Sequence, residues 1–155
     1  MVLNNKQATQ EVVKMKKVMI PLAEGFEEIE AVTNIDVLRR AGLEVITAGV
    51  EKKEVEGDHG LKIEADLLLD EVEINELDAI VLPGGMPGAA NLRNSDKLLW
   101  LIKELDDREG LIAAICAAPM VLDKAGVIKE KKATSYPGFG EEMPTCDYQE
   151  ERVVR

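Results

Sequence analysis

The sequence has few basic residues, two cysteines and one histidine, and each shortage argues against a class of function. Its 19 Lys and Arg face 30 Asp and Glu, for a net charge of −11, whereas a nucleic-acid partner requires a basic face. Cys116 and Cys146 have neither the pattern of a disulfide framework nor zinc-ligand spacing. With His59 as the single histidine, the scattered acidic residues form no ligand set. We therefore expect no nucleic-acid partner, no metal and no organic cofactor.

The sequence also lacks a hydrophobic run long enough to cross a bilayer. Residues 1–14 are polar and have no apolar centre of the kind found in signal peptides. We expect them to be a disordered leader, and we expect residues 15–155 to form one α/β domain with a single hydrophobic core. This composition fits a cytoplasmic protein with free thiols and no membrane partner.

Short aliphatic segments alternate with amphipathic ones, which indicates βαβ units and a parallel sheet covered on both faces. Strands are expected at 16–22, 43–49, 61–65, 78–82, 111–115 and 132–135. Residues 51–60 are expected to form a turn or a small hairpin. Residues 136–150 are rich in Gly, Pro and acidic residues and are expected to be loop, and 152–155 are expected to begin a further strand.

Hydrophobic spacing predicts three helices. The first follows the acidic segment 23–30 and ends at Gly42, the second is capped by Ser95, and the third covers 120–127. The expected inward faces are Ile29, Val32, Ile35 and Leu38 in the first helix, and Leu98, Leu99, Leu101, Ile102 and Leu105 in the second.

Three predicted strands end in segments that can carry chemistry. The carboxyl ends of parallel strands meet at one edge of a sheet, and ligands bind there in open α/β folds. The segments that follow strands at this edge are 24–30, 83–85 and 116–117. The pattern therefore predicts that an acidic helix start, a glycine pair and a cysteine converge.

Cys116 lies between a predicted strand and Pro119, which is the layout of a nucleophile elbow with cysteine in place of serine. The alternative is a buried cysteine that acts as a small hydrophobic residue. At a helix N-terminus the thiol pKa is expected to fall below its ordinary value. The backbone N–H groups of Ala117 and of Gly84 or Gly85 can stabilise an oxyanion. The alternative is that the glycine pair forms only a tight turn after the strand.

Other polar residues have two interpretations each. A carboxylate within 24–30 either stabilises the helix N-terminus from the surface or points toward Cys116 and relays a proton. His59 is expected to be exposed or at an interface, and only secondarily to carry a proton. Cys146 stands beside Asp147, which disfavours a thiolate, so we expect it to be non-catalytic.

Three segments resemble the ThiJ/PfpI superfamily, the group that includes the parkinsonism-associated protein deglycase. They are AEGFEEIE at 23–30, VLPGG at 81–85 and AAICAAP at 113–119, in the order and approximate spacing of that group. The resemblance covers residues 16–155. It implies a flavodoxin-like three-layer sandwich with a mostly parallel sheet, and a homodimer or higher homo-oligomer.

The resemblance also implies roles for individual residues. Cys116 would be the reactive cysteine, Glu30 its carboxyl partner, and Gly85 and Ala117 the backbone donors. In such relatives the cysteine oxidises readily to a sulfinate. The activities attributed to them are cofactor-free glyoxalase action, deglycation of proteins and nucleotides, redox-regulated chaperoning and, in one branch, peptidase action.

The sequence departs from these relatives at three places. The peptidase branch has histidine where this chain has Ala117, and the parkinsonism-associated branch often has histidine where this chain has Tyr136. Proton transfer would then rest on Glu30 or water, and on His59 only if a dimer partner supplies it. Relatives continue past 152–155 into a strand, a loop and a closing helix. We therefore expect a domain that lacks its C-terminal strand and helix. The chain is expected to be truncated or cleaved, or a partner is expected to cover the sheet that these elements would cover.

The leading prediction is a cysteine-dependent, cofactor-free enzyme that acts on reactive carbonyls, as a glyoxalase or a deglycase does. Its substrate would be a small aldehyde such as methylglyoxal, or an early glycated adduct. The alternative is a non-enzymatic redox sensor or chaperone that uses the same oxidisable Cys116. A third hypothesis is an intracellular cysteine peptidase.

Overall fold

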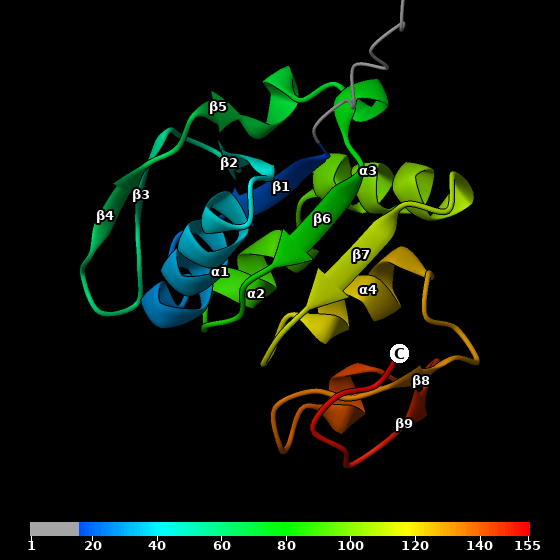
Figure 1. Ribbon diagram of the computed structural model, residues 1–155. Helices are drawn as coiled ribbons and strands as arrows, with labels where there is room; N and C mark the ends of the chain where they lie inside the picture. Colours follow the sequence, from blue (N-terminus) through cyan, green and yellow to red (C-terminus); the bar gives the residue numbers. More distant parts are fainter. Residues whose placement is uncertain (1–15) are drawn as a thin grey trace, which may run out of the picture.

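The computed structural model describes residues 16–155, and within them five parallel strands form a central sheet (Figure 1). Their order is β5-β2-β1-β6-β7. The bounds are β1 Lys17–Leu22, β2 Glu44–Gly49, β5 Leu67–Leu68, β6 Ala79–Leu82 and β7 Leu111–Ala114. The order β2-β1-β6-β7 is that of flavodoxin-like sheets, so the predicted fold class is confirmed. The expected leader, 1–14, lies outside the described residues.

Helices cover both faces of the sheet, with α1 on one face and α2, α3 and α4 on the other (Figure 1). Their bounds are α1 Glu28–Arg40, α2 Gly88–Arg93, α3 Asp96–Asp107 and α4 Pro119–Ala125. In β1, Val18 and Ile20 pack in the core under α1, whereas Met19 belongs to the core on the other face. Burial on both faces explains the apolar run of β1, whereas β7 at the edge of the sheet is at most partly buried. None of the described helices is both long and apolar enough to cross a membrane.

The second predicted helix is confirmed as α3. The Leu98 N–H donates to the Ser95 hydroxyl oxygen at 3.3 Å, which is the expected N-cap. The residues on its inward face that are fully buried are Leu98, Leu101, Ile102 and Leu105, while Leu99 is partly buried against the same core. This face packs α3 onto the sheet.

The predicted inward face of α1 is wrong at its first turn. Ile29 and Val32 are 74% and 41% exposed, and the buried residues there are Glu28 and Ala31. Polar contacts set this rotation, because Glu28 accepts N–H groups from the turn after β3 and Glu30 accepts one from Gly84. Apolar periodicity alone therefore misplaced the start of the helix.

The remaining short elements are a hairpin and a second small sheet. A hairpin is present, but it extends beyond the expected 51–60. Its first strand is β3 Glu54–Glu56, and the strand expected at 61–65 is its second, antiparallel strand β4 Lys62–Glu64. Strand β8 Lys132–Ala133 pairs in parallel with β9 Asp147–Tyr148, inside the segment expected to be loop. Two-residue strands that pair over this separation leave no sequence periodicity, so β9 was missed. The strand expected at 152–155 is wrong, because these residues are irregular.

Candidate active site

The chain turns sharply at Cys116, between β7 and α4. Its φ of 60° is a left-handed conformation that costs a non-glycine residue roughly 1–2 kcal/mol. The Ala118 N–H donates to the Ile115 carbonyl at 3.0 Å across the turn, and the Tyr136 N–H donates to the Cys116 carbonyl at 2.8 Å. The predicted strand-to-helix turn with cysteine at its tip is therefore present.

Glu30 and Gly84 meet at this turn. The Gly84 N–H donates to Oε2 of Glu30 at 2.7 Å. A Cβ at position 84 would lie 2.7 Å from Cβ of Cys116 and 2.8 Å from Oε2 of Glu30, closer than real Cβ atoms approach their neighbours. Only glycine leaves room here for the carboxylate and the cysteine. The structure thus brings together three of the residues that the sequence singled out.

The pKa of the Cys116 thiol is raised above its ordinary value, contrary to the expectation from the sequence. Burial raises it most, and the Glu30 carboxylate raises it further through its charge and its hydrogen bond. The backbone N–H groups of Gly85 and Ala117 bond to the sulfur and lower the pKa, but they do not outweigh the other effects. Helix α4 begins only at Pro119 and has 7 residues, so its dipole contributes little. Burial and the Glu30 carboxylate therefore favour the protonated thiol.

This cluster can support nucleophilic chemistry without a stable thiolate. A thiol hydrogen-bonded to a carboxylate can give up its proton as the sulfur attacks an electrophile. N–H groups beside the sulfur can stabilise negative charge that develops on an atom bonded to it. Cys116 is partly exposed, so a small electrophile can reach it from solvent.

The two auxiliary candidates occupy different places. The Tyr136 backbone contacts Cys116. The residue is 58% exposed, and its ring packs edge-on against Phe139. His59 lies beside the start of α1, with Nδ1 2.9 Å from Oε2 of Glu28. Among the described residues, the structure records no contact between His59 and Cys116.

Glu28 is a buried carboxylate that the sequence did not distinguish from its acidic neighbours. Burial by itself would raise its pKa, but hydrogen bonds from the His59 ring and from backbone N–H groups, including those of His59 and Leu61, lower it to about 2. The His59 N–H donates to Oε1 at 2.6 Å. No local pattern links residues that are 31 positions apart, so only the fold reveals this contact.

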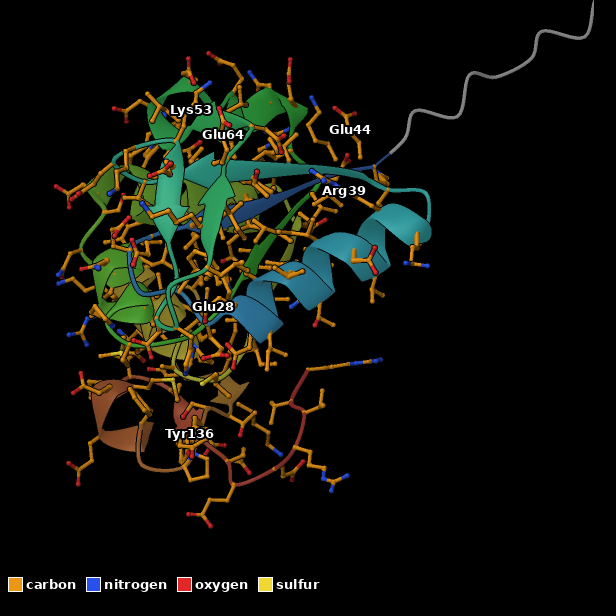
Figure 2. The ribbon with its side chains drawn as sticks, turned by 90° about the vertical axis from the view of Figure 1, so that its left-hand side faces the viewer. Glu28, Arg39, Glu44, Lys53, Glu64 and Tyr136 are labelled. Carbon is orange, nitrogen blue, oxygen red and sulfur yellow. The ribbon has the colours of Figure 1, made fainter. Side chains whose placement is uncertain are left out.

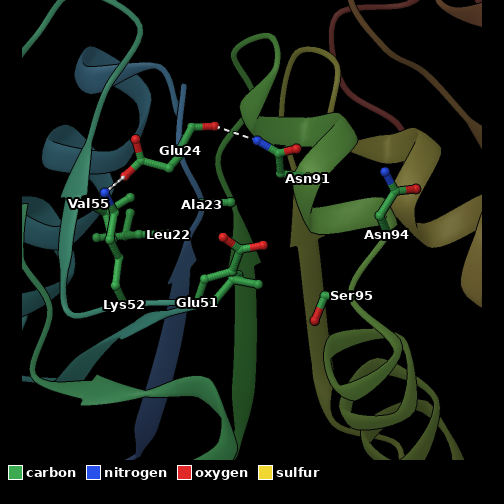
Figure 3. Close-up of a pocket in the computed structure, with 10 residues that line it drawn as sticks. Leu22, Ala23, Glu24, Glu51, Lys52, Val55, Asn91, Asn94 and Ser95 are labelled. Atoms are coloured by element: carbon green, nitrogen blue, oxygen red, sulfur yellow. Dashed lines mark hydrogen bonds and ion pairs between the residues drawn. The ribbon is translucent and has the colours of Figure 1, made fainter.

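A cavity of about 290 Å³ lies near the carboxyl ends of β1 and β2 (Figure 3). Inside it, Lys52 pairs with Glu24 at 3.1 Å, and the Asn91 amide donates to the Glu24 carbonyl at 2.9 Å. The lining residues are Leu22, Ala23, Glu24, Val50, Glu51, Lys52, Val55, Asn91, Asn94 and Ser95. None of the residues clustered at Cys116 lines it, so the two sites are distinct.

Comparisons with known proteins agree with this fold. Residues 16–155 match the DJ-1/PfpI family. Deglycase PfpI of Pyrococcus furiosus is 35% identical over 127 residues, which cover 82% of this chain and 76% of that protein. The structure of oxidised DJ-1 from Toxoplasma gondii aligns with a TM-score of 0.83 and 43% identity, over 90% of this chain and 77% of that one.

One relative is much longer than this chain. Protein DJ-1 homolog B of Arabidopsis thaliana is 45% identical over 133 residues, which cover 84% of this chain but 30% of that protein. The chain therefore spans about a third of that relative. The family match covers all of the described residues, 16–155. On the family match and on these identities, the chain belongs to the DJ-1/PfpI family.

Proposed function

We propose that this protein is a cysteine-dependent enzyme of the deglycase type that needs no cofactor and acts on reactive carbonyls. The observation that carries the proposal is the contact of Cys116, at a left-handed turn, with the Glu30 carboxylate and the backbone of Gly84. Relatives that are named deglycases support the same class of substrate, a small aldehyde or a glycated group.

The proposed first step is the addition of the Cys116 sulfur to an aldehyde carbon. The thiol proton passes to Glu30, which is hydrogen-bonded to the sulfur, as the carbon–sulfur bond forms. The carbonyl π pair moves onto oxygen, where the N–H groups of Gly85 and Ala117 stabilise the charge until a proton returns. The product is a hemithioacetal on Cys116.

With methylglyoxal, the second step is an internal isomerisation. Glu30 removes the proton from the carbon bonded to sulfur, and the ketone oxygen gains a proton, which gives an enediol. A proton is then added at the ketone-derived carbon while the hydroxyl on the sulfur-bearing carbon loses its proton, which yields a lactoyl thioester. Water then hydrolyses the thioester to lactate and restores the thiol. The sum is methylglyoxal plus water to lactate, so no external oxidant or reductant is required.

Turnover of methylglyoxal tests the proposal. Cys116→Ala is expected to abolish lactate formation, and Cys146→Ala, a matched removal of the other free thiol, is expected to retain it. Loss of a nucleophile that forms a covalent intermediate removes the pathway entirely. Unchanged activity of the Cys116→Ala protein would exclude the mechanism.

A second function, redox sensing or redox-controlled chaperoning, uses the same residue. It is favoured by the partial exposure of Cys116 and by the two N–H groups at its sulfur, which can hold the oxygens of a sulfinate. Peroxide titration with mass spectrometry separates the two functions. Selective gain of two oxygens at Cys116, in protein that does not turn over carbonyls, supports the sensor.

A peptidase is not supported by a specific contact. Ala117 follows the cysteine, and His59 contacts Glu27 and Glu28. Homodimer formation and a cytoplasmic location remain predictions. Light scattering on the purified protein and fractionation of its host cells test them.

A further inference from the structure

Three side chains with metal-ligand atoms meet where the turn of the β3–β4 hairpin touches the start of α1. Glu27 and Glu28 come from the helix start, and His59 comes from the turn. Nδ1 of His59 is 2.9 Å from Oε2 of Glu28 and 3.7 Å from Oε2 of Glu27. All three ligand atoms lie within 4.8 Å of one another. Figure 2 shows Glu28 at this junction.

We propose that Glu27, Glu28 and His59 bind a divalent transition-metal ion of the zinc class. Bonds from Zn²⁺ to imidazole nitrogen and carboxylate oxygen are about 2.1 Å, so neighbouring ligand atoms are separated by roughly 3 to 3.5 Å. The distances of 2.9 and 3.7 Å from Nδ1 bracket that range. The three ligand atoms, which already lie within 4.8 Å of one another, would converge on the ion when it binds.

Backbone groups already orient the buried ligand. Oε1 of Glu28 accepts the His59 N–H at 2.6 Å and the Leu61 N–H at 3.4 Å, so its second oxygen is left facing the imidazole. A Cβ at Gly57 would lie 2.5 Å from the carboxyl carbon of Glu28, so only glycine lets the turn approach this closely. Hydrogen bonds of this kind hold metal ligands in position.

Charge and exposure also fit a hydrated divalent ion. Two carboxylates and a neutral imidazole sum to −2, and Asp58 adds to the negative field around His59. The side chain of His59 is 69% exposed and that of Glu27 is 23% exposed, so water can complete the coordination shell. One nitrogen and two hard oxygens favour Zn²⁺, Co²⁺ or Ni²⁺ over ions that prefer thiolate.

The site differs from the Cys116 cluster and does not depend on the proposed enzymatic function. Its ligands join the hairpin turn to the helix start, whereas the cysteine lies between β7 and α4. The sequence predicted no metal because its one histidine and its scattered acidic residues form no ligand set. The fold brings His59 next to Glu28 across 31 positions. The ion would fasten the hairpin to the start of α1.

A Zn²⁺ titration of the full chain tests the proposal. Calorimetry measures the binding, and ¹⁵N NMR of the imidazole monitors the ligand nitrogen. The chain has one histidine, so its ring signals need no assignment. We expect one saturable site, with the ¹⁵N shift of Nδ1 changed by the metal and Nε2 protonated. His59→Gln and Glu27→Gln are each expected to weaken binding by at least about tenfold. Both side chains are partly exposed, so neither change threatens the fold.

Two controls decide where the ion binds. Glu64→Gln removes an exposed carboxylate at the far end of the hairpin (Figure 2) and is expected to leave the affinity unchanged. Cys116→Ser is expected to bind Zn²⁺ as the parent does. Binding that is lost with Cys116→Ser, or that survives His59→Gln undiminished, overturns the proposal, as does a titration without saturable binding.

Discussion

The two cysteines of this chain are both free and partly buried, yet their surroundings differ. Cys116 stands at a left-handed turn, with N–H groups of Gly85 and Ala117 at its sulfur and the Glu30 carboxylate beside it. Cys146 lies in the small C-terminal sheet region. Its sulfur donates to the Met143 carbonyl at 3.5 Å and is hydrogen-bonded by its own backbone N–H.

Burial is the main cause that raises the pKa of both thiols, so the two pKa values shift in the same direction. In both cases a neighbouring carboxylate adds to the shift, Glu30 for Cys116 and Asp123 for Cys146. Glu30 is also hydrogen-bonded to the Cys116 thiol, whereas Asp123 acts on Cys146 through its charge alone. The difference that matters is therefore a carboxylate able to take a proton, together with N–H donors aimed at the reacting atoms.

Removal of proton transfer at one cysteine is expected to have the largest effect. Glu30→Gln keeps an oxygen for the Gly84 N–H but cannot accept the thiol proton, so methylglyoxal turnover is expected to fall about 10²- to 10⁴-fold. Asp147→Asn makes the same charge change beside Cys146 and should leave turnover within about twofold. Steady-state kinetics check both, and equal losses would show that proton transfer at Cys116 is not the cause.

Crowding of the turn at Cys116 is expected to have the second largest effect on turnover. In Gly84→Ala the new methyl group meets Cys116 and Glu30, and overpacking of this kind costs about 1–3 kcal/mol and displaces the two side chains. Gly138→Ala is the matched change near the C-terminal sheet, where φ is 95° and nothing lies within 4 Å, so only backbone strain is added.

Thermal unfolding and turnover separate these two glycine variants. Both proteins are expected to lose stability, and only Gly84→Ala is expected to lose turnover as well. If Gly138→Ala loses turnover to the same extent, the close approach at Gly84 is not what the reaction requires.

The sequence predicted the elbow well because its signals are local. A short aliphatic strand, a cysteine and a proline in the next helix turn lie within 111–119, and the structure has β7, the left-handed residue and α4 in that order. The glycine pair and Glu30 were placed at the same sheet edge by topology and by resemblance, and Gly84 and Glu30 do touch. Strands and turns that are determined by neighbouring residues in the chain can therefore be predicted from the sequence alone.

What the sequence missed depends on contacts between distant segments. The rotation of α1 that exposes Ile29 follows from the polar contact of Glu28 with His59, and neither residue carries a signal for the other. The direction of the Cys116 pKa shift was wrong for a related reason. The helix dipole was inferred from local order, while the dominant causes are burial and the Glu30 charge.

The pH dependence of alkylation sharpens the comparison of the two thiols. Because both pKa values are raised above the ordinary 9.0, the thiolate fraction of each is expected to grow about tenfold per pH unit and to be still rising at pH 9.0. Glu30→Gln removes a charge that raises the Cys116 pKa, so Cys116 should alkylate several-fold faster at pH 8 while Cys146 is unchanged. Iodoacetamide labelling quantified peptide by peptide measures both; equal acceleration of the two would point to general loosening of the fold.

The smallest effect is expected at Tyr136. Its backbone N–H donates to the Cys116 carbonyl at 2.8 Å, and its exposed ring packs against Phe139 at a centroid distance of 6.4 Å. Tyr136→Phe keeps both of these contacts and removes only the hydroxyl, so turnover is expected to stay within about twofold, far below the loss that general acid–base catalysis would produce. Steady-state kinetics from pH 6 to pH 9 check this. A loss of tenfold or more would mean that the hydroxyl carries a proton at the site, and Glu30 would then not be the sole acid and base beside Cys116.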